Sequence, residues 1–213
     1  MAHEYLFKEY ELCFQQFRIY DDRQESLLKY LCTLTSATAV AEFAIYQFFK
    51  GPTVEFFRAE AFLSALVFAA TLLIFVAGLQ NRLYFVFMAR QLNGIRKYLM
   101  EMAAEGFHDN QLYTSTTFPA LKPFSTHTLM IIASALMSSM FAGASVYGIT
   151  SALPRALGFA IGTTSVVLAA EVSCGMAYLM IQGDKRADHA IHHRKQYPNT
   201  TADPKPKTES STD

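Results

Sequence analysis

The stretch AFLSALVFAATLLIFVAGL, residues 61–79, decides the fold because it runs without a single charged side chain. A helix of about 20 apolar residues, rising 1.5 Å per residue, crosses the hydrocarbon core of a bilayer. Three further stretches, residues 31–49, 129–149 and 157–181, are long and apolar enough for the same role. The chain is therefore predicted to be an all-α, polytopic membrane protein with four transmembrane helices and helical cytoplasmic extensions.

The composition argues against several other classes of protein. Of the 213 residues, 52% are hydrophobic and 17% are charged, against about 25% charged in soluble domains. Disordered chains combine low hydrophobicity with high net charge, whereas here 18 basic and 18 acidic residues cancel. The same balance argues against a nucleic-acid partner. The four apolar stretches could instead be buried helices of a soluble domain, but that would need a larger soluble envelope than the remaining residues provide.

The positions of the basic residues predict the orientation in the membrane. Residues 1–30 hold four Lys or Arg, residues 80–128 hold five, and the tail after Ile181 holds six, whereas the two remaining connections hold three. Basic residues close to membrane spans stay on the cytoplasmic side. Both termini and the central connection are therefore predicted to be cytoplasmic, in a multi-pass protein of an inner or plasma membrane.

The chain is predicted to divide into five parts. Amphipathic cytoplasmic helices occupy residues 1–30, a first transmembrane hairpin 31–79, a cytoplasmic helical extension and connection 80–128, a second transmembrane hairpin 129–181, and a juxtamembrane helix end with a disordered tail 182–213. The candidate functional residues are therefore expected in two regions, the membrane spans and the cytoplasmic helices next to them.

Two cytoplasmic stretches, residues 4–19 and 82–105, each gather apolar side chains on one helix face. We expect these faces to pack on each other rather than lie on the membrane surface. Asp22 and Glu25 have the spacing of a capping box, which predicts that a second N-terminal helix begins near Arg23. No helix breaker separates residues 82–105 from the span before them, so the two are predicted to form one rod.

Two carboxylates, Glu42 and Glu171, lie inside predicted spans. A carboxylate near the bilayer centre costs roughly 2.5–3.5 kcal/mol on insertion scales and usually marks a site. Counted along the helices, Glu42 lies about 16 Å and Glu171 about 15 Å from the predicted cytoplasmic ends of their spans. On neighbouring helices the two could share a proton in a relay or line a cation site, and in an oligomer they could line a pore. Alternatively, both are protonated and only hold neighbouring helices together.

Three sets of residues are candidates for specific roles. The intramembrane polar site consists of the two carboxylates and the polar side chains near them: Glu42, Glu171, Thr35, Thr38, Tyr46, Thr164 and Tyr178. Small residues that let helices approach closely form the packing set: Ala135, Ser139, Gly143, Gly158 and Gly162. Basic residues beyond the last span are candidates for contact with lipid headgroups: Lys185, Arg186, Arg194 and Lys195.

Histidines give little indication of a metal or cofactor site. His189 and His193 lie one helical turn apart, which is a spacing that metal ligands use. Contact of this basic stretch with anionic lipid explains its composition more simply. No metal and no cofactor are therefore predicted, and the isolated His127 is assigned no role.

The function is predicted from these features and from the motifs that the sequence lacks. No nucleophile–base pair, phosphate-binding glycine loop or metal-binding motif is visible, so no enzymatic activity is predicted. The leading hypothesis is a membrane protein that self-associates and controls ion or proton permeability, with residues 1–30 or 82–105 as a sensor or protein-partner surface. In size and topology it is similar to small helical membrane effectors of bacterial defence and signalling systems. The alternatives are a small proton-coupled transporter using the same carboxylates, and a scaffold or partner subunit without transport.

Overall fold

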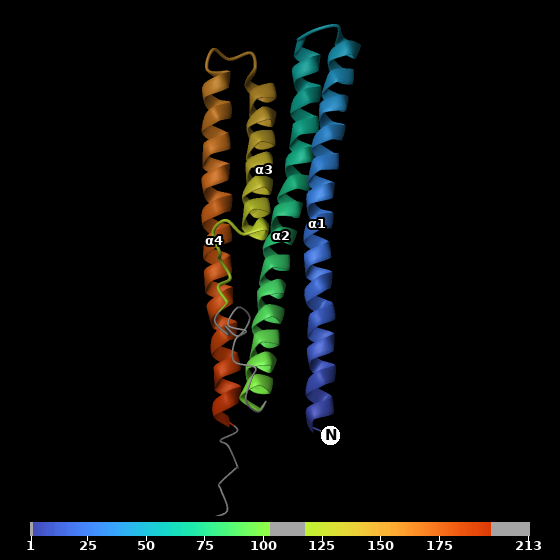
Figure 1. Ribbon diagram of the computed structural model, residues 1–213. Helices are drawn as coiled ribbons and strands as arrows, with labels where there is room; N and C mark the ends of the chain where they lie inside the picture. The colour runs from blue at the N-terminus through green and yellow to red at the C-terminus, as the bar shows by residue number, and fades with distance from the viewer. Residues whose placement is uncertain (1, 103–117, 197–213) are drawn as a thin grey trace, which may run out of the picture.

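The computed structural model describes residues 2–102 and 118–196, with side chains described for residues 4–100 and 118–183. This part of the chain forms four helices: α1 (Ala2–Phe49), α2 (Val54–Met102), α3 (Thr126–Thr150) and α4 (Ala156–Gln196). The α1–α2 turn and the α3–α4 turn lie at the same end of the molecule (Figure 1). At the other end α1, α2 and α4 continue well past the start of α3, so a four-helix bundle narrows into a longer projection (Figure 1).

Three of these helices, α2, α3 and α4, contain segments long and apolar enough to cross a membrane. This confirms the all-helical fold and agrees with a membrane protein. α1 contains the first predicted span, residues 31–49, but is not among the three helices. Its many Ser and Thr side chains, together with Glu42, lower its apolar character.

α1 is one continuous helix of 48 residues. The prediction that a second helix begins near Arg23 is therefore wrong. The backbone oxygen of Asp22 accepts a hydrogen bond of 2.9 Å from the Ser26 hydroxyl inside the unbroken helix. A capping box acts only where a helix starts, and residues 2–49 contain no Gly or Pro to create such a start. α2 is likewise unbroken over 49 residues, which confirms the predicted rod.

The helix ends follow from local sequence. α1 and α2 are joined by a tight turn in which Lys50 has φ 54° and Gly51 has φ 131°. The second value is one that glycine adopts far more readily than other residues. α3 begins after Ser125, whose hydroxyl accepts a hydrogen bond of 3.2 Å from the backbone nitrogen of Thr128. This N-cap sets where the chain re-enters the bundle.

The core of the bundle lies between α2, α3 and α4, and its buried members are Phe75, Leu79, Leu83, Val86, Ala120, Ile131, Ala135 and Leu179. α2 and α3 approach each other closely near the end that holds the turns. The Ser145 hydroxyl on α3 donates a hydrogen bond of 3.0 Å to the Ala61 carbonyl oxygen on α2. A Cβ atom added to Gly148 would lie 2.6 Å from the Phe57 carbonyl oxygen, so only glycine permits this approach.

Beyond the bundle, residues 2–20 of α1 and 82–102 of α2 form a pair of helices that we call the stalk. Cys13 of α1 is buried against Leu92 and Ile95 of α2. Stacking of Phe17 on Phe85, with ring centroids 4.3 Å apart, extends this contact toward the bundle. The apolar faces therefore pack on each other, as predicted. Burial, with help from the nearby Glu9 carboxylate, raises the pKa of the Cys13 thiol to about 11.

Candidate functional site

Two contacts fix the register between α1 and α2. The end of the bundle from which the stalk extends is called the inner end. There, the Asn81 side-chain amide donates a hydrogen bond of 2.9 Å to the Gln24 side-chain oxygen. Toward the turn between the two helices, the carboxyl groups of Glu42 and Glu60 are near enough to interact electrostatically. Residues 24–42 of α1 therefore run beside residues 60–81 of α2, which include the charge-free segment.

Glu42 and Glu60 form a pair of neighbouring carboxyl groups. The Oε2 atom of Glu60 is buried and has no hydrogen-bond partner among the described residues. Neighbouring carboxylates repel each other when both are ionised, so such a pair is an arrangement that a bound cation stabilises. The pair was not predicted, because residue 60 precedes the apolar stretch and the sequence does not show which side chains of α1 face α2.

Glu171 lies at a different interface. It is buried on α4, with 8% of its surface exposed, and its Oε1 atom accepts a hydrogen bond from the Ser138 hydroxyl of α3. Its Oε2 atom is buried without a hydrogen-bond partner in the described part of the chain. The side chain borders a small apolar cavity lined by Phe75 and Ile131 among others. Glu42 and Glu171 therefore each meet a different partner, and the chain does not bring them together as a pair.

The remaining members of the predicted polar set do not converge on one place. The hydroxyls of Thr35, Thr38 and Thr164 each donate to the backbone carbonyl four residues earlier, at 2.8, 2.7 and 3.0 Å. Such bonds satisfy a hydroxyl within its own helix. Tyr46 and Tyr178 are exposed on the bundle surface, with Tyr46 packed edge-on against Phe56.

The predicted packing residues divide between the inside and the outside of the bundle. Ala135 and Ser139 of α3 are fully buried. Gly143 lies against Ala160 and Thr164 of α4, where a side chain would have no room. In contrast, Gly158 and Gly162 are exposed, and a Cβ atom added to either would meet nothing within 4 Å. These two glycines take no part in packing among the described residues.

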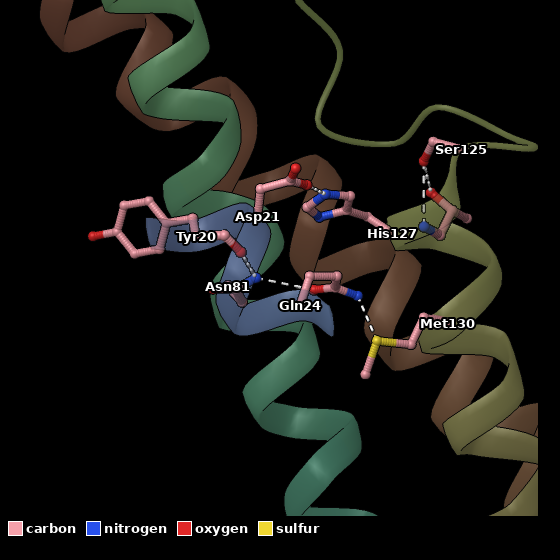
Figure 2. A network of polar contacts seen from close by, with 8 residues as sticks. Tyr20, Asp21, Gln24, Asn81, Ser125, His127 and Met130 are labelled. Carbon is pink, nitrogen blue, oxygen red and sulfur yellow. Dashed lines mark hydrogen bonds and ion pairs between the residues drawn. The ribbon is translucent and has the colours of Figure 1, made fainter. Parts of the chain in front are cut away.

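A network of polar contacts joins α1, α2 and α3 at the inner end of the bundle (Figure 2). Asn81 of α2 also donates a hydrogen bond of 2.8 Å to the Tyr20 carbonyl oxygen of α1, and the Gln24 amide reaches the Met130 sulfur of α3 at 2.6 Å. His127 of α3 lies 3.3 Å from the Asp21 carboxylate of α1. The network spans three helices at the level where the stalk begins.

A buried arginine ties the return segment to α2 at the same level. Arg82 is 1% exposed, and its guanidinium group donates hydrogen bonds of 2.9 and 3.4 Å to the carbonyl oxygens of Ala120 and Pro119. The rings of Phe85 and Phe118 lie 5.7 and 5.6 Å from its central carbon. Carbonyl dipoles and aromatic faces both stabilise a cation. Arg82 thereby fixes the segment that leads into α3.

Arg90 makes a second attachment two helical turns further along the stalk. It donates a hydrogen bond of 2.8 Å to the Phe118 carbonyl oxygen and another of 2.7 Å to the Gly183 carbonyl oxygen of α4. The return segment and the inner part of α4 are thus attached to the same face of α2. The stalk is connected to every helix of the bundle at this level.

We call the polar network, together with Arg82 and Arg90, the polar junction, and its contacts were not predicted from the sequence. His127 was assigned no role, and Arg82 was counted only as a topological charge. One signal was available, since Gln80, Asn81 and Arg82 directly follow the charge-free segment, where polar groups mark the end of a span. Their partners come from residues 20–24 and 118–130, and nothing in the local sequence pairs these regions.

The basic residues predicted to contact lipid, Lys185, Arg186, Arg194 and Lys195, continue α4 as a helix, and their side chains lie outside the described part. The predicted tail beyond residue 196 and the connection over residues 103–117 also lie outside the described residues. Among the side chains that are described, no group of three His, Cys, Asp or Glu residues is arranged to hold a metal ion. No family model, curated protein or solved structure matches the chain, so its function has to be inferred from its own geometry.

Proposed function

We propose that the protein spans the membrane four times, with both termini and the stalk in the cytoplasm. The apolar segments of α2, α3 and α4 support three of the spans. α1 becomes the fourth because its residues 24–42 lie beside the apolar segment of α2. The continuation of α1, α2 and α4 from the same end of the bundle supports the orientation, since that end carries most of the basic residues (Figure 1).

Within this frame we propose that the protein self-associates and controls ion or proton permeability, with the stalk as its sensor or partner surface. One observation carries the proposal. α1 and α2 run without a break from the stalk contact around Cys13 to the carboxyl pair Glu42–Glu60. A helix transmits displacement along its axis. A shift of one stalk helix relative to the other therefore alters the distance between the carboxyl groups of Glu42 and Glu60.

The chemistry of the pair suits a gate for protons or small cations. When the carboxyl groups share a proton, the charge between α1 and α2 is small and the helices stay together. Loss of that proton leaves two like charges in a low-dielectric environment, which separates the helices or attracts a cation. The polar junction at the inner end holds the stalk in register while this change takes place.

Flux measurements in proteoliposomes test the proposal. The double variant Glu42→Gln/Glu60→Gln cannot exchange a proton at the pair, and it is expected to abolish flux of protons or monovalent cations. Glu55→Gln, an exposed carboxylate near the start of α2, is the matched control and should leave flux unchanged. Unchanged flux in the double variant, with the helical content preserved, overturns the permeability proposal.

A second candidate is a membrane scaffold or partner subunit without transport. It is favoured by exposed apolar side chains on the stalk: Tyr5, Leu12 and Ile19 recur every seven residues and are 68%, 55% and 60% exposed. A repeat of seven is typical of helices that bind another helix. A soluble helical protein that co-purifies in fixed ratio with the wild-type chain, and is lost with Leu12→Ser/Ile19→Ser, would support this candidate if no flux is found.

The proton-coupled transporter has no such observation in its favour. It would use the same carboxyl pair, and it differs from a permeability gate in moving a solute together with the proton. Solute counterflow driven by a pH gradient in the same proteoliposomes would identify it. Flux of protons alone, lost in the double variant, supports the gate instead.

A further inference from the structure

α1 carries polar side chains on the face that points away from the rest of the bundle. Glu25, Lys29, Thr33 and Ser36 are spaced four, four and three residues apart, which places them on one side of a helix. All four are exposed, and we call them the outer stripe. The buried side of the same stretch faces α2 with Leu27, Leu31 and Thr38, the last of these 4% exposed.

The outer stripe lies at the depth of the apolar segment of α2. The contacts of Gln24 with Asn81 and of Glu42 with Glu60 bracket the region. Between them, α2 presents the charge-free residues 61–79. If this segment of α2 is in the membrane, Thr33 and Ser36 are in the membrane as well, and Glu25 and Lys29 lie at its edge, next to Gln24.

The other three helices expose mainly large apolar side chains, with Ser165 and Ser173 of α4 as exposed polar exceptions. Outward positions at this depth include Phe62, Leu66 and Leu73 on α2, Ile132, Leu136 and Met140 on α3, and Ile161, Val166 and Met176 on α4. Such surfaces are suited to lipid, because no polar group loses its hydrogen bonds to water there. The face of α1 differs in its first half, where the outer stripe lies, and becomes apolar further on with the exposed Val40 and Phe43.

The polar side chains of the outer stripe are poorly suited to contact with lipid. At the edge of the span, Glu25 and Lys29 cost less than charged residues at its centre, for which insertion scales give roughly 2.5–3.5 kcal/mol. Glu25 and Lys29 reduce this cost through their 2.7 Å ion pair, and a long lysine side chain can also reach toward the headgroups. Thr33 and Ser36 are too short to do so. Unlike Thr35 and Thr38, they form no hydrogen bond to a backbone carbonyl within the described residues.

We propose that the outer stripe is covered by α1 of a second copy of this chain, so that α1 lies on the inside of the oligomer. The inference rests on the proposed membrane placement and names the surface through which the copies associate. All copies share one orientation, so their α1 helices run parallel. Glu25 of one copy then lies near Lys29 of the other, and the hydroxyls of Thr33 and Ser36 find partners across the contact.

Disulfide crosslinking tests which helix faces the second copy. In a Cys32→Ser/Cys174→Ser background, Ser36→Cys places a thiol in the outer stripe. Leu136→Cys on α3 and Val166→Cys on α4 are matched controls on apolar faces, exposed by 41% and 69% in the wild-type protein. After oxidation in proteoliposomes at high lipid-to-protein ratio, Ser36→Cys is expected to give several-fold more covalent dimer than either control.

Charge reversal provides an independent readout that also reports on folding. Glu25→Lys and Lys29→Glu each give the stripe two like charges, and each variant alone is expected to lose most of its dimer. When the two variants are reconstituted together with different tags, opposite charges meet and mixed dimers should return. Recovery in the mixture shows that both chains fold.

The outcomes separate this inference from the permeability proposal. Dimer formed chiefly through Val166→Cys would show that copies meet through α4, and it overturns the inference. Absence of dimer at every position overturns it too, since the stripe is then covered by another molecule or left uncovered. Strong crosslinking at Ser36→Cys without carboxyl-dependent flux supports the contact and rejects the gate, whereas the reverse result keeps the gate and rejects the contact.

Discussion

α1 and α3 both carry many polar side chains among apolar ones, but α3 buries most of them whereas α1 leaves several exposed. In α3, Ser134, Ser138 and Ser139 are fully buried. In α1, the outer stripe points away from the bundle. α3 contacts both α2 and α4 and can bury its hydroxyls between them, whereas α1 packs mainly on α2. If α1 spans the membrane as proposed, the outer stripe meets a neighbour outside the chain, which is the contact between copies proposed above.

The largest effect is expected from removing Arg82, which fixes the segment that leads into α3. Arg82→Ala leaves the carbonyl oxygens of Ala120 and Pro119 without their donor and empties the space between two rings. We expect the free energy of unfolding in detergent to fall by on the order of 3 kcal/mol, since a buried hydrogen-bonded charge is lost. Lys97→Ala, at an exposed position of the same helix, is the control and should change little. Equal stability of the two variants would show that Arg82 does not anchor the return segment.

A smaller effect is expected from replacing a glycine between two helices, compared with a glycine on the outer surface of the bundle. Gly148→Ala forces a methyl group against the Phe57 carbonyl oxygen and should destabilise the protein by about 1–3 kcal/mol, as overpacking does. Gly158→Ala enters open space and is expected to leave thermal unfolding unchanged or slightly raised. If both variants unfold at the wild-type temperature, α2 and α3 do not approach each other closely at Gly148.

The two faces of α1 can be compared through thiol reactivity, where no loss of stability at neutral pH is expected. Cys13 faces α2, and its pKa of about 11 keeps the thiol protonated at pH 7. In a Cys32→Ser/Cys174→Ser background, alkylation by iodoacetamide should be slow at pH 7 and rise steadily toward pH 10, because the thiolate is the nucleophile.

The matched control moves the thiol to the exposed face of the same helix. Phe14→Cys, combined with Cys13→Ser in that background, should react much faster at pH 7. The free energy of unfolding is also expected to depend on the ionisation of the Cys13 thiol. Because the thiol of the unfolded chain ionises at its ordinary pKa of 9.0 and the folded thiol only near 11, the contribution of the buried Cys13 is constant below pH 9 and declines as the pH rises further. Equal alkylation rates at pH 7 would contradict the burial of Cys13.

Much of the fold could be predicted because its signals are local. Long apolar runs with at most one charged residue fall within α2, α3 and α4, and the absence of a breaker after residue 79 predicted the rod of α2. The error near Arg23 had a physical cause: a capping box stabilises a helix start but does not create one inside a helix held by neighbours. Gln24, at the site of the expected break, is 4% exposed and bonded to Asn81 and Met130.

The candidate site was less predictable because its contacts are long-range. Glu42 and Glu171 were paired by their depth, which the sequence can supply. Whether two residues at one depth meet depends on which helices are neighbours, and α2 and α3 provide the partners Glu60 and Ser138. His127 joins Asp21 across 106 positions of the chain. A side chain without a local pattern gives no indication of such a partner.

The sequence by itself determined the helical class, the three most apolar segments and the distribution of basic charge, because each depends on composition over a few turns of helix. The tertiary structure decided which polar groups are inside. It buried Glu171 and the serines of α3, joined Glu42 to Glu60, locked Arg82 and His127 at the junction, and left the outer stripe of α1 facing outward. These outcomes depend on how helices are placed around α2, and only the packing of distant segments sets that placement.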